Sequence, residues 1–194
     1  MRCILKNAKV FSQGVFHLAD VFLSDGKIVS IGNGASRSDD TITIDISNMV
    51  LFPGFVDVHV HLREPGFSYK ETIATGSAAC AHGGYTTVCT MPNLNPAPDS
   101  SEHLAVEEAL IQGEAVIDVR PYASITMGQK GEGELTDMAA LSGRVCGFSD
   151  DGRGVKTAET IWQAKRKCPD LRLVAPHREE YVKYSRRCNE LYLQ

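Results

Sequence analysis

The 194-residue sequence lacks the features that mark several classes of protein. Nowhere do eighteen apolar residues follow one another, and the N-terminal residues do not combine a basic start, an apolar run and a small-residue cleavage site. The net charge of −4, with both signs mixed along the chain, provides no basic face for nucleic acid and no polybasic membrane segment. We therefore expect a cytoplasmic protein with no nucleic-acid or membrane partner.

The chain also lacks any Cys-x-x-Cys pair, internal repeat or low-complexity stretch, and its six cysteines are scattered. In a reducing compartment such cysteines are expected to be small buried hydrophobic residues rather than disulfides or thiolate ligands. The hydrophobic fraction of 43% is ample for a core. A chain of this length is expected to form one domain, or one domain with a small appendage.

The N-terminal part of the chain is predicted to consist of short strands. A hairpin turn is expected at Ser24-Asp25-Gly26-Lys27, because Gly26 can adopt a positive φ between two alternating apolar runs. The predicted strands are Ile4–Phe11, Ala19–Leu23, Lys27–Ile31 and Thr41–Ile46. This part is interpreted as a small β unit.

From Val50 onward, predicted strands and helices alternate, which favours an α/β fold with parallel strands. The first helix is expected to start at Ser68, where Ser68-x-x-Glu71 could form a capping box, and to end at Gly83. The predicted strands are Val50–Val58, Thr86–Met91, Val116–Ile125, Val145–Phe148 and Leu171–Ala175. The other predicted helices are Ser101–Gln112, Thr136–Leu141, Thr157–Lys167 and Glu179–Leu193. Polar residues follow several strand ends, as in a TIM-type barrel, whose active sites lie at the C-terminal face.

Two histidines one residue apart end the first of these strands. Because side chains alternate along a strand, His59 and His61 should point to the same face and could bind one cation. A bare His-x-His is also compatible with two polar residues at a strand end. Arg63 strengthens the first interpretation, since a guanidinium can hold a planar carboxylate in bidentate fashion, although a surface salt bridge with Glu64 or Glu71 is the alternative.

Five short motifs occur in order along the chain. They are His59-x-His61-x-Arg63-Glu64-Pro65-Gly66, Lys70-Glu71-Thr72, Gly83-Gly84-Tyr85-Thr86-Thr87-Val88, Met91-Pro92-Asn93 and Phe148-Ser149-Asp150-Asp151-Gly152. In these motifs the chain resembles a bacterial-type dihydroorotase of the amidohydrolase superfamily over about residues 1–177. Hydantoinases and allantoinases share the His-x-His and Gly-Gly-x-Thr-Thr runs, but the Arg-Glu-Pro-Gly and Met-Pro-Asn motifs resemble dihydroorotase more closely.

The resemblance implies a site for one or two zinc ions. His59 and His61 would bind the first ion, and Asp151 matches the position that bridges both ions. Asp150 is the alternative, because neighbours in an extended loop cannot both aim at the same ion, and an Asp-Asp-Gly step is often only a turn. His177 matches a ligand of the second ion, but a lone histidine at a strand end can also be a polar surface residue.

By the same resemblance, Arg63 and Asn93 would hold the exocyclic carboxylate of dihydroorotate or carbamoyl aspartate. Leu94 departs from the threonine usual after this asparagine. The implied reaction is the reversible hydrolysis of dihydroorotate in pyrimidine synthesis. The implied architecture is a portion of a β-sandwich at residues 1–49, followed by a partial TIM-type (β/α) barrel of about five strand-helix units at residues 50–194.

Several parts of the resembled family have no counterpart in this sequence. A complete barrel takes about 250 residues, more than the whole chain of 194. The family's histidine after strand six and proton-shuttling aspartate after strand eight are absent, so no catalytic residue is identified and the isolated chain is expected to be inactive. The residues after His177 do not resemble the family, which a frame change or a truncated gene model would explain.

Two further interpretations stay open from the sequence. One is a non-catalytic, dihydroorotase-like partner of a transcarbamoylase. The other is a fragment with exposed sheet edges that folds poorly. The partners expected are the small-molecule substrate and either a second copy of the chain or a transcarbamoylase.

Overall fold

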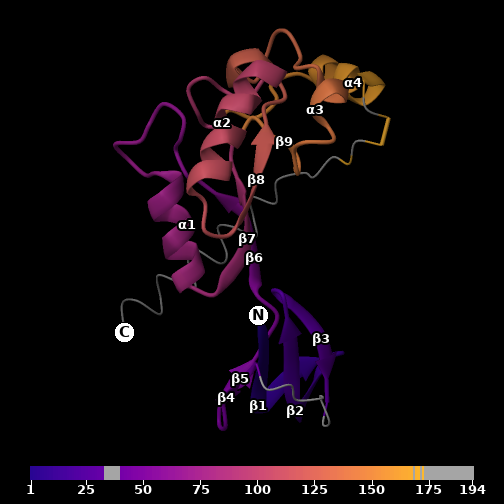
Figure 1. Ribbon diagram of the computed structural model, residues 1–194. Helices are drawn as coiled ribbons and strands as arrows, with labels where there is room; N and C mark the ends of the chain where they lie inside the picture. Colours follow the sequence, from indigo (N-terminus) through magenta and orange to yellow (C-terminus); the bar gives the residue numbers. More distant parts are fainter. Residues whose placement is uncertain (33–39, 168, 171, 173–194) are drawn as a thin grey trace, which may run out of the picture. The chain divides into compact units, whose positions relative to one another are not determined.

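A computed structural model describes residues 1–32, 40–167, 169, 170 and 172 (Figure 1). The chain divides into two compact units, one made of residues 1–57 and 79–87 and the other of residues 58–78 and 88–194. Three elements contribute to both units: β6 (Phe55–Val60), α1 (Ile73–His82) and β7 (Tyr85–Thr90). The predicted strand at Leu171–Ala175, the predicted helix at Glu179–Leu193 and His177 lie outside the described residues, apart from Arg172.

The first unit contains a five-stranded mixed sheet of order β3-β2-β1-β4, with β5 also pairing with β1. β1 is antiparallel to β2 and parallel to β4 and β5, and β2 is antiparallel to β3. The strand bounds are Arg2–Ser12 for β1, Val15–Ser24 for β2, Lys27–Ile31 for β3, Thr41–Asp45 for β4 and Val50–Leu51 for β5. The four strands predicted for this part of the chain are all present.

The predicted hairpin turn lies between β2 and β3. Ser24 pairs with Lys27, and the two residues between them have positive φ angles, 51° at Asp25 and 76° at Gly26. This backbone matches a type I′ turn, whose twist suits the flanking strands. The hydrophobic core of the sheet is formed by small and β-branched residues, namely Ala8, Val10, Ala19 and Val21.

The prediction of one continuous strand over Val50–Val58 is wrong. Val50 and Leu51 form β5 on the first sheet, and the chain leaves that sheet before β6 begins at Phe55. Pro53 has no N–H for a strand hydrogen bond. Gly54 lies so close to its neighbours that a Cβ atom there would be 2.1 Å from a Thr86 side-chain carbon.

The second sheet has the order β6-β7-β8-β9, in which β8 (Asp118–Ala123) and β9 (Gly147–Phe148) pair in parallel. Helices α1, α2 (Ser101–Glu114), α3 (Met138–Leu141) and α4 (Ala158–Lys167) follow the four strands in turn, with a short 3-10 helix at Met127–Gln129 (Figure 1). The predicted alternation of strands and helices is thereby confirmed as an α/β arrangement. The count of five strand-helix units stays a prediction.

Helix α1 begins at Ile73 rather than at the predicted Ser68. The backbone N–H of Ile73 donates to Glu64 Oε2 at 2.8 Å, and Thr72 Oγ1 accepts from the N–H of Thr75 at 3.1 Å. These side chains satisfy N–H groups at the start of the helix, a role that the sequence pattern assigned to Ser68. The predicted cap of α4 is confirmed, since Thr157 Oγ1 accepts from the N–H of Thr160 at 3.2 Å.

Two hydrophobic clusters lie between the helices and the second sheet. One contains Leu104, Ala123 and Leu141, with Phe148 packed against it. The other contains Leu135, Met138 and Ala164. They connect α2, α3 and α4 to the ends of β8 and β9, where the polar loops begin.

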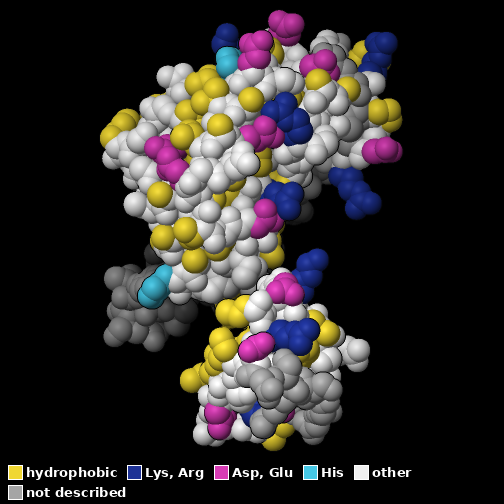
Figure 2. Space-filling view, in the orientation of Figure 1, with side chains coloured by type: hydrophobic (Ala, Val, Ile, Leu, Met, Phe, Trp, Pro, Cys, Tyr) yellow, Lys and Arg dark blue, Asp and Glu magenta, His cyan; other side chains and the backbone are white. Residues whose placement is uncertain are grey.

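Large apolar side chains also remain exposed on strands of both sheets, among them Leu18, Ile28, Val56 and Val58. Figure 2 shows hydrophobic side chains, in yellow, interspersed with charged ones on the visible face. None of the helices in the described ranges is both long and apolar enough to cross a membrane.

Helix α2 buries a carboxylic acid. Glu107 is only 1% exposed, and neither of its carboxylate oxygens has a hydrogen-bond partner among the described residues. Burial raises the pKa of Glu107 well above its usual value, and the neighbouring Glu108 raises it further. The folded state therefore retains a proton that the unfolded chain releases above a pH of about 4.5.

We expect Glu107→Gln to raise the free energy of unfolding at neutral pH and to leave it nearly unchanged below the usual pKa of the carboxyl. Between the pKa values of Glu107 in the unfolded and folded states, the free energy of unfolding of the wild-type chain should fall, relative to that of the variant, by about 1.4 kcal/mol for each unit that the pH rises. Denaturant unfolding across pH 4 to 8 measures this difference. Glu114→Gln, at an exposed position on the same helix, is the control; parallel curves for wild type and Glu107→Gln would contradict the prediction.

Candidate metal centre

The two histidines lie at the C-terminal end of β6. His59 belongs to the strand and His61 follows Val60, whose carbonyl accepts from the N–H of Met91 at 2.9 Å. The imidazole rings have centroids 5.4 Å apart at an interplanar angle of 75°. The two side chains therefore lie on the same side of the backbone, as strand alternation predicts.

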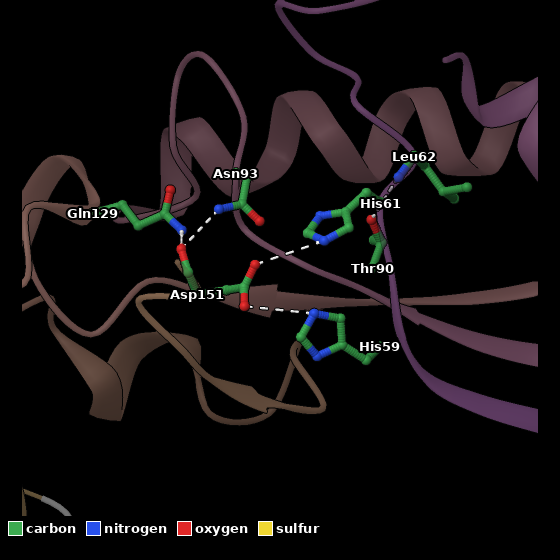
Figure 3. Close-up of polar contacts among 7 residues, drawn as sticks. All are labelled: His59, His61, Leu62, Thr90, Asn93, Gln129 and Asp151. Atoms are coloured by element: carbon green, nitrogen blue, oxygen red, sulfur yellow. Dashed lines mark hydrogen bonds and ion pairs between the residues drawn. The ribbon is translucent and has the colours of Figure 1, made fainter. Parts of the chain in front are cut away.

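Asp151, from the loop after β9, faces both rings (Figure 3). Its Oδ1 lies 3.5 Å from His59 Nε2, and its Oδ2 lies 3.7 Å from His61 Nε2. One potential ligand atom from each of the three residues lies within 4.8 Å of the other two. Three residues far apart in the sequence thus present two imidazole nitrogens and a carboxylate to a common point.

The spacing of these atoms fits a divalent cation. Zinc binds imidazole nitrogen and carboxylate oxygen at about 2.0–2.2 Å, so ligand atoms around a tetrahedral ion are roughly 3.4 Å apart. The observed separations of 3.5 and 3.7 Å are close to that value and long for direct hydrogen bonds. The His59 side chain is 51% exposed, which leaves room for a water or substrate ligand on the open side.

The electrostatic environment favours the ligand form of His61. Partial burial lowers the pKa of His61, the Arg63 cation lowers it further, and the Asp151 carboxylate opposes both effects. A neutral imidazole carries the lone pair that a metal requires. The other ring nitrogen, Nδ1, is buried and has no hydrogen-bond partner among the described residues, which leaves Nε2 as the atom that faces Asp151.

Asp150 has a different role from its neighbour. It is 3% exposed, and its Oδ1 accepts from the backbone N–H groups of Ile125 and Thr126 at 2.9 and 3.2 Å. Its Oδ2 accepts from Thr126 Oγ1 at 2.6 Å. The carboxylate is occupied in holding the loop that follows β8. Of the two alternatives left open by the sequence, the geometry therefore favours Asp151 as the candidate ligand.

Arg63 and Asn93 flank the histidines. Arg63 has a left-handed backbone, with φ of 64°, and its side chain forms no ion pair with any residue that the structure describes. The suggested partners, Glu64 and Glu71, instead accept hydrogen bonds at the start of α1. Asn93 Nδ2 donates to the main-chain oxygen of Asp151 at 2.9 Å.

The sequence did not single out Gln129, whose Nε2 donates to the same Asp151 oxygen at 3.1 Å (Figure 3). It lies in a polar loop with no motif around it, so no local signal identifies it. The other described histidines lie elsewhere: His103, for example, contacts Asp99 through its Nδ1 at 2.6 Å. Among the described cysteines, Cys3 and Cys89 are buried free thiols, as expected, whereas Cys80 is only partly buried and Cys146 is exposed.

Comparison with known proteins places the chain in a family. The sequence profile described as dihydro-orotase-like matches residues 48–182. A dihydroorotase from Ligilactobacillus salivarius is 45% identical over 184 residues, which cover 93% of this chain and 43% of that protein. A dihydroorotase from Staphylococcus aureus is 48% identical over 162 residues, covering 82% of this chain and 38% of that protein.

Solved structures of hydantoinases share the fold. An L-hydantoinase from Arthrobacter aurescens superimposes with a TM-score of 0.73 at 20% identity, over 86% of this chain and 38% of that one. A D-hydantoinase from a Thermus species gives a TM-score of 0.67 at 23% identity, over 85% and 37%. The chain thus spans less than half the length of these relatives. Because the family profile covers most of its residues, the chain belongs to the dihydroorotase-like family.

Proposed function

We propose that this chain supplies a zinc site and a carboxylate-binding site for a dihydroorotase, which interconverts dihydroorotate and N-carbamoyl-L-aspartate. The observation that carries the proposal is the convergence of His59, His61 and Asp151 on one point. The relatives at 45% and 48% identity, both called dihydroorotase, support this substrate over those of other cyclic amide hydrolases.

His59, His61 and Asp151 would hold the metal ion. A zinc ion in this place would lower the pKa of a water ligand to about 7 and polarise the amide carbonyl of the substrate. The protein residues supply two neutral donors and one negative charge, and the exposed side of His59 leaves the approach for the substrate open. A second ion, with His177 as a ligand, stays a prediction.

Arg63 and Asn93 would orient the substrate through its carboxylate. Arg63 brings a cation close enough to lower the pKa of His61, and its guanidinium has no ion-pair partner among the described residues. Asn93 uses one amide hydrogen on Asp151, and an amide nitrogen carries a second. A carboxylate bound between them would lie beside the proposed metal ion.

The experiment for this proposal is calorimetric titration of the zinc-loaded chain with N-carbamoyl-L-aspartate, dihydroorotate, hydantoin and allantoin. We expect the first two to bind more tightly, because hydantoin and allantoin lack the carboxylate that Arg63 would hold. Equal or tighter binding of hydantoin or allantoin would overturn the substrate assignment and favour the hydantoinase or allantoinase alternative. A cytoplasmic location, a homodimer and association with a transcarbamoylase stay predictions.

Arg63→Lys is expected to weaken binding of N-carbamoyl-L-aspartate by on the order of 2 kcal/mol, or about 30-fold, because an ammonium lacks the planar fork. The positive charge beside His61 is retained, so zinc affinity should stay within a few-fold of wild type. Titration of the wild-type and Arg63→Lys chains with N-carbamoyl-L-aspartate and, separately, with zinc measures the two effects. Arg120→Lys, at an exposed pair with Asp118, is the control. Unchanged ligand affinity in Arg63→Lys would remove Arg63 from the substrate site.

A further inference from the structure

Two amide side chains converge on the main-chain oxygen of Asp151. Asn93 Nδ2 donates to this oxygen at 2.9 Å from the loop after β7, and Gln129 Nε2 donates to it at 3.1 Å from the loop after β8 (Figure 3). A carbonyl oxygen has two lone pairs, and both are used here. The peptide group that follows the proposed ligand carboxylate is therefore fixed from two directions.

The loop that carries Gln129 is itself tightly held. Gln129 has a φ of 54° and follows Gly128 with a φ of 65°, so two successive residues are left-handed. The N–H of Gly128 donates to the buried carboxylate of Asp99 at 2.6 Å. The N–H of Gln129 donates to the Thr126 carbonyl at 2.9 Å. A positive φ is unfavourable for a non-glycine residue and persists only where the surrounding contacts impose it. These contacts therefore fix the position from which the Gln129 side chain extends.

The other side of Asp151 is anchored to the same loop. Asp150 binds Ile125 and Thr126 through its carboxylate, and its carbonyl accepts from the N–H groups of Arg153 and Gly154 at 2.9 and 2.8 Å. The loop after β8 thus contacts the Asp150 carboxylate before the Asp151 Cα and the Asp151 main-chain oxygen after it. The carboxylate of Asp151 is directed toward both histidines.

We infer that Gln129 is a positioning residue that holds Asp151 in the orientation required to bind a cation together with His59 and His61. This inference rests on the proposed metal site. The Gln129 amide acts through the backbone of Asp151, to whose main-chain oxygen it donates. Groups that orient metal ligands typically change metal affinity by 10–100-fold when they are removed.

The test is the zinc affinity of purified wild-type and variant chains, measured by competition with a chromophoric chelator at constant pH. Gln129→Ala is expected to weaken zinc binding by about 10–100-fold. Gln129→Gly also removes the amide, and it relieves the strain of the left-handed backbone. Because the amide is absent in both variants, zinc binding by Gln129→Gly should be weakened to the same extent. The matched control is Gln13→Ala, since Gln13 is an exposed glutamine with a similar φ of 51° in the first unit.

Thermal unfolding of the zinc-free chains separates positioning from folding. Because Gln129→Gly removes the strain, it should be at least as stable as Gln129→Ala and yet not recover zinc affinity. Wild-type affinity in Gln129→Ala, or full recovery of affinity in Gln129→Gly, would overturn the positioning role while leaving the metal site intact. A wild-type chain that binds no zinc would instead overturn the proposed function, and this inference with it.

Discussion

Replacing His61 with alanine is expected to weaken zinc binding by the chain by on the order of 100-fold or more, because a direct ligand matters at least as much as the groups that orient it. His61 Nε2 faces Asp151 Oδ2 at 3.7 Å, and without the imidazole only His59 and Asp151 remain among the described candidate ligands. Two ligands fix neither the coordination number nor the geometry of an ion. Competition with a chromophoric chelator measures the loss.

His17→Ala is the matched control, since His17 is an exposed histidine on β2 in the first unit. It should leave zinc affinity unchanged, and circular dichroism should show that both variants retain the wild-type secondary structure. Zinc binding that survives His61→Ala at full strength would place the ion at another site. It would also remove the observation on which the proposed function depends.

Replacing Asp150 with alanine is expected to lower the free energy of unfolding by about 3 kcal/mol or more. Its buried carboxylate accepts three hydrogen bonds from Ile125 and Thr126, and each buried donor left without an acceptor costs about 1–3 kcal/mol. The loop that carries Gln129 should also loosen, so zinc affinity should fall together with stability. Denaturant unfolding of the zinc-free chain measures the first effect.

Asp150→Asn separates the two aspartates. The asparagine oxygen can still accept hydrogen bonds from the loop, so this variant should be more stable than Asp150→Ala, whereas Asp151→Asn should keep stability and lose zinc affinity. Asp118→Ala removes only an exposed ion pair with Arg120 and should change stability little. If Asp150→Ala were as stable as wild type, Asp150 would not anchor the loop.

The features predictable from the sequence are those set by neighbouring residues. Alternation along a strand places His59 and His61 on one face, and Gly26 supplies the positive φ of the hairpin. Thr157 caps α4 by accepting a hydrogen bond from the N–H of Thr160, three residues later in the first turn of the helix. Each of these outcomes depends on residues a few positions apart, so the local pattern contains the information.

The errors arise where distant residues decide the outcome. The N-terminus of α1 is capped by Glu64, nine positions before Ile73, so the nearer Ser68 pattern was misleading. The strand predicted from Val50 breaks because Val50 and Leu51 pair with β1. Asp150 and Asp151 have the same local sequence context, and only contacts with the loop after β8 and with His59 and His61 distinguish them.

Gln129 was not predictable for the same reason. Its side chain reaches Asp151 across 22 positions of sequence, and its left-handed backbone follows from a loop closed by Asp99 and Thr126. A glutamine in a polar loop is ordinarily a solvated residue. Only the folded arrangement brings it to the carbonyl of a candidate ligand.

X-ray absorption spectroscopy of the chain loaded with one equivalent of zinc tests the central claim most directly. A site built from His59, His61 and Asp151 predicts a first shell of nitrogen and oxygen only, at about 2.0–2.2 Å, with the outer-shell scattering of two imidazoles. His61→Ala should remove one imidazole from that signal or abolish binding. A first shell containing sulfur at about 2.3 Å, or a wild-type spectrum in His61→Ala, would contradict the account.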